Sequence, residues 1–239
     1  MKVWIFMKEK INKLLKYFVS GGLAGFFISF GGLAYILCNA YIKIDSGLAK
    51  FIGALTFTVG LFFICIFSLL LYTGKIGYVI DKEEDKFKKL IICIVSNCLV
   101  AFAMGCISYV IFKNNSDVMN YLDTIVAQKN NFLGNNMLSL ELLIKGYLCG
   151  VCVFIATYIF KKSNTTLFKF LGIIIPIFLF VFSGFEHCIA NVFFVGFAME
   201  FSWQALCNFL LVLVGNSLGS ITFNALFKYI EVKVHDKDN

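Results

Sequence analysis

The stretch SGFEHCIANVFF, residues 183–194, decides how this chain folds, because it sets two ionisable residues inside an apolar run. Glu186 and His187 interrupt a segment, residues 167–199, that otherwise contains very little charge. This segment is too long for one straight helical crossing of a bilayer. Ser183 and Gly184 favour a break, so we expect one half-helix to end there and another to start near Ala190.

The whole chain has the composition of a multi-pass membrane protein. Its 239 residues are 60% hydrophobic and 15% charged, whereas soluble domains are about half apolar and a quarter charged. We therefore predict an all-α integral membrane fold, with a basic amphipathic helix over residues 1–17 on the inner surface, one membrane domain over 18–230 and a tail over 231–239. The six predicted spans are residues 18–41, 49–72, 89–112, 137–160, 167–199 and 203–230.

The lysines predict the orientation of these spans. With both termini in the cytoplasm, fifteen of the lysines fall on the cytoplasmic side and four on the other, which is the usual bias of membrane proteins. We therefore expect a protein of the cytoplasmic membrane with both ends inside, and no nucleic-acid partner for its net charge of +7. The inner group is Lys2, Lys8, Lys10, Lys13, Lys16, Lys82, Lys86, Lys88, Lys89, Lys161, Lys162, Lys169, Lys228, Lys233 and Lys237, and the outer group is Lys43, Lys50, Lys113 and Lys129.

The two halves of the chain follow the same plan. Each has an unbroken span, a broken span, and a third span with an asparagine among small residues: Asn97 in SNCLVA and Asn216 in GNSLGS. Three spans per half place the halves in opposite orientations, and in such inverted repeats paired broken helices form a site near the middle of the membrane. The first break is expected in LLLYTGKIGY, residues 69–78, where Gly74 and Gly77 permit tight turns.

Each break has a functional and a structural interpretation. At the first, Thr73 and freed backbone N–H groups line a cavity to which Lys75 adds positive potential, or else Thr73 bonds to its own backbone at a simple kink. At the second, His187 either faces a pore or is a hydrogen-bonded core residue, and its position inside a bilayer favours the pore. We expect hydrogen bonds from backbone or asparagine to hold Glu186 within the protein.

The sequence offers little support for redox, metal or enzymatic chemistry. All nine cysteines fall in apolar segments, where cysteine acts as a small hydrophobic residue. Cys149 and Cys152 have a thiol-redox spacing, but they lie in mid-span without the βαβ context that this motif needs. Glu186 and His187 are the one acid–base pair in the spans, and no nucleophile or metal-ligand set accompanies them. We therefore expect neither an enzyme nor a cofactor.

Several motifs together resemble the formate–nitrite transporter family of small-anion channels. The resemblance covers all six predicted spans, and it implies an aquaporin-like protomer and a homopentamer in which each protomer has its own pore. The motifs are SGFEHCIANVFF at residues 183–194, SGGLAGFFISFGG at 20–32, LYTGKIG at 71–77, NCLVAF at 97–102, KGYLCGVCVFIATY at 145–158 and GNSLGS at 215–220.

The resemblance also implies roles for residues along the pore. His187 matches the central pore histidine of the family, and Thr73 matches the threonine that faces it from the second-span loop. Leu61, Leu71 and Phe180 match the apolar constrictions on either side of the histidine.

Further matches concern the rim of the pore and the support of the histidine. Asn191 matches the polar residue that braces the fifth-span break, and Lys129 matches the lysine over the outer vestibule. Lys145 stands where the family often has arginine. Gly150 stands where the family has an asparagine that bonds near the histidine, so we expect water or another side chain to orient His187 here.

The implied function is a passive or proton-coupled pathway for formate, nitrite or hydrosulfide, with a slight preference for formate or hydrosulfide. The alternative is an aquaporin-like pore for neutral solutes. Such pores typically carry two Asn-Pro-Ala motifs and a selectivity arginine, whereas this chain has one proline, Pro176, outside such a motif, and no arginine.

Overall fold

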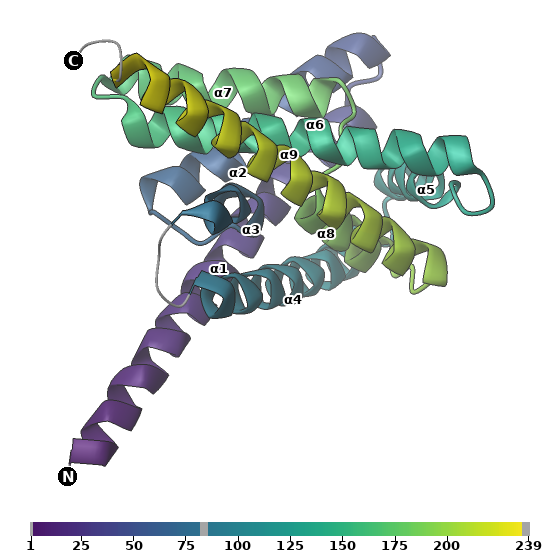
Figure 1. The fold of residues 1–239 in the computed structure, drawn as a ribbon. Coiled ribbons are helices and arrows are strands. Elements are labelled where there is room, and N and C mark those ends of the chain that lie inside the picture. Colours follow the sequence, from purple (N-terminus) through teal and green to yellow (C-terminus); the bar gives the residue numbers. More distant parts are fainter. Residues whose placement is uncertain (1, 82–85, 236–239) are drawn as a thin grey trace.

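The computed structural model describes residues 2–81 and 86–235, and this part of the chain is built of helices with short connections (Figure 1). The all-α prediction is thus confirmed. The helices are α1 (Lys2–Tyr41), α2 (Ser46–Ile66), α3 (Tyr72–Lys75), η1 (Ile76–Ile80), α4 (Lys86–Phe112), α5 (Ser116–Asn130), α6 (Asn136–Lys162), α7 (Thr166–Phe182), α8 (Cys188–Ala198) and α9 (Trp203–His235).

The long apolar helices make this chain a multi-pass membrane protein. Within the described residues, five helices are long and apolar enough to cross a membrane: α1, α2, α4, α6 and α9. The shorter apolar helices α7 and α8 flank residues 183–187, so the predicted break in the fifth span is present. The count of six crossings stays a prediction, in which α7 and α8 together form one crossing.

The second span breaks earlier than the sequence predicts. Helix α2 ends at Ile66 rather than near residue 72, and Ser68 takes a left-handed conformation with φ 54°. Gly74 and Gly77 were expected to adopt turn conformations that other residues cannot. This is wrong, because both lie in short helical segments and neither has a positive φ. They are small because neighbours are close: a Cβ atom on Gly77 would lie 2.9 Å from a backbone oxygen of α9, and one on Gly74 would lie 3.1 Å from Thr157 Cγ2.

Helix α5 lies between the predicted third and fourth spans, where no helix was predicted. Its first turn is capped by Asn115, whose side chain accepts a hydrogen bond from Val118 N at 3.2 Å. Val118, Leu122 and Val126 recur every four residues and are buried, so one face of the helix packs on α1 and α8. This packing brings the end of α5, and with it Lys129, close to the second break.

The chain ends lie at one end of the bundle, and α5 lies at the other (Figure 1). Helix α1 continues from Lys2 into the first span without a break, and its N-terminal part extends beyond the other helices in Figure 1. The domain boundaries expected at residues 17 and 230 thus fall inside α1 and α9. Two lysines used to predict the orientation, Lys82 and Lys237, lie outside the described residues.

The two halves pack through equivalent close contacts. A Cβ atom on Gly25 in α1 would lie 2.4 Å from Asn97 O in α4, and one on Gly150 in α6 would lie 2.2 Å from Asn216 O in α9. Small residues of this kind let two membrane helices approach backbone to backbone. Gly150, the departure from the family pattern, therefore has no room for a side chain in this structure.

Candidate functional site

Asn97 holds the first helix break with three hydrogen bonds. Its Nδ2 donates to Gly21 O at 2.7 Å and to Leu70 O at 2.9 Å, and its Oδ1 accepts from Tyr72 N at 2.8 Å. Backbone that leaves a helix inside a membrane needs such partners, since lipid offers none.

Asn216 holds the second break in the same way. Its Nδ2 donates to Gly146 O at 2.7 Å and to Glu186 O at 2.8 Å, and its Oδ1 accepts from Cys188 N at 3.0 Å. Each asparagine thus bonds to the backbone on both sides of a single residue. That residue is Leu71 in the first half and His187 in the second. These two residues are the N-caps of α3 and α8, so the internal repeat extends to the centre of the site.

His187 is held from both sides of its ring. Nδ1 accepts a hydrogen bond from Ala190 N at 3.2 Å, and Nε2 lies 2.9 Å from Thr73 Oγ1. Because Nδ1 is the acceptor, we assign the proton of the neutral ring to Nε2, which donates to Thr73. Thr73 therefore bonds across the molecule rather than to its own backbone, and it is the side chain that orients His187 without the family asparagine at Gly150.

Two cavities lie on either side of the hydrogen bond between Thr73 and His187. The terminus-side cavity, at the end of the bundle that holds both chain ends, has a volume of about 410 Å³ and is lined by Leu71 and Gly74 at its inner end. The α5-side cavity has a volume of about 480 Å³ and is lined by Phe180 and His187. The ring of Phe180 stacks on that of His187 at a centroid distance of 6.1 Å, so an apolar side chain borders the polar centre on each side.

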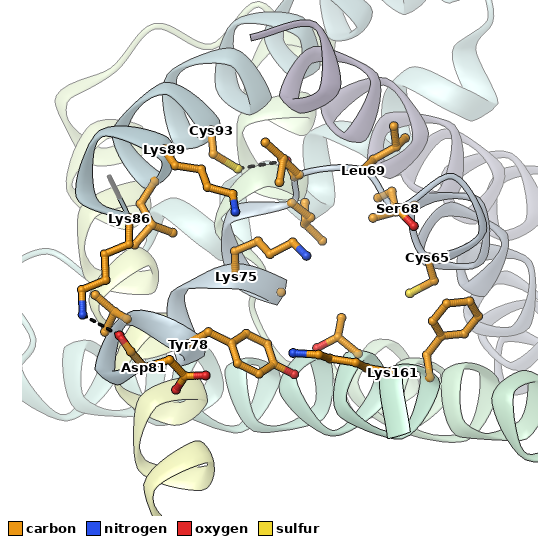
Figure 2. A pocket seen from close by; sticks show the side chains of 18 residues that line it. Cys65, Ser68, Leu69, Lys75, Tyr78, Asp81, Lys86, Lys89, Cys93 and Lys161 are labelled. Carbon is orange, nitrogen blue, oxygen red and sulfur yellow. Dashed lines mark hydrogen bonds between the residues drawn. The ribbon is translucent and has the colours of Figure 1, made fainter. Parts of the chain in front are cut away.

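Both cavities carry lysines. Figure 2 shows Lys75, Lys89 and Lys161 extending into the terminus-side cavity. The α5-side cavity is lined by Lys50, Lys129 and Lys145, together with Tyr35 and Tyr121 from α1 and α5. Lysines of the two predicted orientation groups thus lie at opposite cavities. Lys145, which belongs to neither group, lines the α5-side cavity and pairs with Glu141 at 2.6 Å.

Glu186 lies in a buried polar network beside the α5-side cavity. Its Oε2 accepts from Lys129 Nζ at 2.5 Å and from Asn191 Nδ2 at 2.8 Å. Asn208 completes the network, because its Oδ1 accepts from Asn191 and its Nδ2 donates to Lys129 O, each at 2.8 Å. The asparagine partner of Glu186 agrees with the sequence prediction. The ion pair of Glu186 with Lys129 was not predicted. It balances the positive charge of Lys129, which was expected to lie over the outer vestibule without a partner.

The apolar lining differs in one position from the expected one. Leu61 is 1% exposed in α2 and lines neither cavity. Phe57, one helical turn earlier, lines the α5-side cavity and meets Phe180 edge-on at a centroid distance of 5.7 Å. Neither Phe57 nor Asn208 was predicted, because neither stands in a recognisable motif.

No metal or disulfide chemistry is arranged in the described part of the chain. No group of three or more His, Cys, Asp and Glu side chains is placed there to hold a metal ion, and the nine cysteines are free thiols.

Comparison with known proteins identifies the family of this chain. Residues 5–230 match the family model described as formate/nitrite transporter. The chain belongs to this family. An uncharacterized transporter of Bacillus subtilis, YrhG, is 28% identical over 97% of this chain and 90% of its own length. A probable formate transporter of Methanothermobacter thermautotrophicus is 28% identical over 95% of this chain and 92% of its own. The formate channel FocB of Escherichia coli is 26% identical over 74% of this chain and 64% of its own.

Solved structures of this family share the fold. A pentameric formate channel with formate bound superposes with a TM-score of 0.78 at 19% identity, covering 92% of this chain and 98% of the other. An ion channel of the same family gives 0.77 at 20% identity, covering 93% and 92%.

Proposed function

We propose that this chain is a channel for small monovalent weak-acid anions, with formate or hydrosulfide preferred over nitrite. The observation that carries the proposal is the pair of lysine-lined cavities that meet at the hydrogen bond between Thr73 and His187. The family description and the names of FocB and its relatives support the same substrate class.

The geometry suggests how an anion crosses. Lys50 on the α5 side, where Glu186 and Glu141 balance Lys129 and Lys145, and Lys75 on the terminus side attract anions, which raises their local concentration. An anion between Leu71 and Phe180 loses most of its water, at a cost of many kcal/mol. Taking up a proton removes that cost, and a neutral acid then passes the centre while His187 Nε2 donates a hydrogen bond to it in place of Thr73. Flux therefore rises as the pH falls, because more of the weak acid is protonated.

The assembly and orientation belong to the same proposal. The pentameric relative supports a ring of five protomers, each with its own pathway. Large apolar side chains are exposed along several spans, for example Phe30, Ile91 and Leu210, and they face lipid or a neighbouring protomer. Both chain ends lie in the cytoplasm, as the lysine bias predicts.

The test is uptake into proteoliposomes of the purified full-length chain, comparing formate, hydrosulfide, nitrite, chloride and glycerol. We expect saturable uptake of the three weak-acid anions and little passage of chloride or glycerol. Free passage of glycerol or water with no anion selectivity would favour the neutral-solute pore instead.

A further inference from the structure

The terminus-side cavity brings together lysines from three separate elements. Lys75 rises from α3, Lys89 from α4 and Lys161 from α6, and the three side chains converge on one space (Figure 2). Lys75 and Lys161 carry like charges on separate elements, so the arrangement is stabilised when a multiply charged anion lies between them.

Asp81, a carboxylate that lines this cavity, forms an ion pair with neither Lys75 nor Lys161. Asp81 is held by Lys228 Nζ at 2.6 Å and by Asn224 Nδ2 at 3.0 Å, while Lys86 bonds to the backbone oxygen of Asp81 at 2.8 Å. Within residues 2–81 and 86–235, Lys75 has no ion pair or hydrogen bond. Its charge is therefore available to a ligand.

A further donor lines the same cavity. The Tyr78 hydroxyl is buried beside Thr157, and it meets the geometry of a hydrogen bond with no residue in the described part of the chain. Lys161 Nζ lies over the ring of Tyr78, 4.8 Å from its centroid. The cavity thus offers ammonium groups and a hydroxyl, which suit the oxygens of phosphate groups.

We infer that this cavity binds the phosphate groups of a small polyvalent anion, and that the bound anion blocks the pathway. The blocking part rests on the proposed function, whereas the binding part does not. A volume of about 410 Å³ holds a group of pyrophosphate size. Leu71, two residues before Thr73, lines this cavity. The cost of dehydrating an ion rises with the square of its charge, so a polyvalent anion binds there without passing the centre.

The binding test is isothermal titration of pyrophosphate into the purified full-length chain in neutral detergent. We expect Lys75→Gln and Lys161→Gln each to weaken binding about tenfold through loss of one charge-assisted contact. Lys162→Gln is the matched control, because Lys162 neighbours Lys161 but lies outside the cavity, paired with Glu231 at 3.1 Å. Absence of binding, or equal weakening by Lys162→Gln, would overturn the inference.

The blocking test is formate uptake into phosphatidylcholine vesicles with pyrophosphate on both faces. We expect pyrophosphate to reduce uptake by the unaltered chain several-fold and to have little effect on Lys75→Gln. A lipid headgroup can supply the same phosphate chemistry, so a second set of vesicles contains phosphatidylglycerol. Reduced uptake in these vesicles that Lys75→Gln relieves would support the cavity as the site and name lipid as the source.

The two proposals fail separately. Pyrophosphate binding without uptake of any tested anion would overturn the proposed function and leave the binding site standing. Anion uptake without pyrophosphate binding would overturn the binding site and leave the proposed function standing. Binding that leaves uptake unchanged would overturn the block.

Discussion

At the residue scale, the ion pair between Lys129 and Glu186 ties the end of α5 to the second helix break. Its side chains are 16% and 11% exposed, so both charges have lost most of their water. Removing one partner of such a pair leaves the other charge buried alone, which costs more than removing both.

We therefore expect Lys129→Met to lower the free energy of unfolding by about 3 kcal/mol. Glu186→Gln, added to Lys129→Met, should recover part of this loss, because the neutral amide still accepts a hydrogen bond from Asn191. Thermal unfolding in detergent measures both. If the double variant is less stable than Lys129→Met, the buried charge is not what costs stability.

At the element scale, Asn97 and Asn216 hold the two breaks with matching hydrogen bonds, so the two halves depend on them equally. Each replacement by alanine removes these three hydrogen bonds and leaves one backbone N–H at the break, that of Tyr72 or of Cys188, without its partner, at a cost of roughly 1–3 kcal/mol for that group.

We expect Asn97→Ala and Asn216→Ala to lower the unfolding temperature by similar amounts and to reduce transport. Asn164→Ala, at an exposed position between α6 and α7, is the control and should leave both properties unchanged. A large effect of one asparagine and none of the other would contradict the equivalence of the two halves.

The close approach of helices gives a second test at this scale. Gly150→Ala places a Cβ atom against Asn216 O, and Gly25→Ala places one against Asn97 O, so both should destabilise the protein by pushing a helix pair apart. Gly22→Ala is the control in α1, since its Cβ atom would meet only the Val100 side chain, at 3.1 Å. Gly150→Asn restores the family residue. If this variant folds as well as the unaltered chain, α6 and α9 can move apart at Gly150 without loss of stability, contrary to this prediction.

Sequence reasoning predicted some features of these elements and not others. Asn97 and Asn216 were recognisable because each stands among small residues in a corresponding span, and the break at Gly184 because glycine permits its φ of 73°. The break at Ser68 was not predicted, since no sequence rule favours a left-handed serine there. Helix α5 was also missed. Its apolar residues recur every four positions, but most of its other residues are polar, as in a loop between two spans.

Contacts between distant segments were the least predictable part of the site. Leu71 and His187 became equivalent only once the hydrogen bonds of the two asparagines were seen. The pairing of Lys129 with Glu186 depends on how α5 packs, which the spans alone do not determine. Family resemblance supplied the partner of His187, because Thr73 is 114 residues away along the chain.

At the scale of the whole molecule, the lysine bias predicts one direction of insertion. A single cysteine introduced at Lys43 or Lys113, in a chain without its native cysteines, should react with an impermeant thiol reagent from outside intact cells. A cysteine at Lys162 should react only after the cells are opened. The reverse pattern would place both chain ends outside.

Assembly is a second property of the whole molecule. We expect the purified protein in mild detergent to have a protein mass five times that of the 26.9 kDa chain, as the pentameric relative suggests. Light scattering with correction for detergent measures it. A monomer that transports formate would show that each protomer needs no partner.

The measurement that tests the central claim most directly is the ratio of formate to chloride uptake by proteoliposomes of the unaltered chain and of His187→Ala. If anions cross where His187 meets Thr73, the substitution removes the central donor, and the ratio should fall about tenfold, the effect of roughly 1.4 kcal/mol. Lys162→Gln, outside both cavities, should keep the original ratio. An unchanged ratio in His187→Ala, with formate uptake intact, would contradict a pathway through this centre.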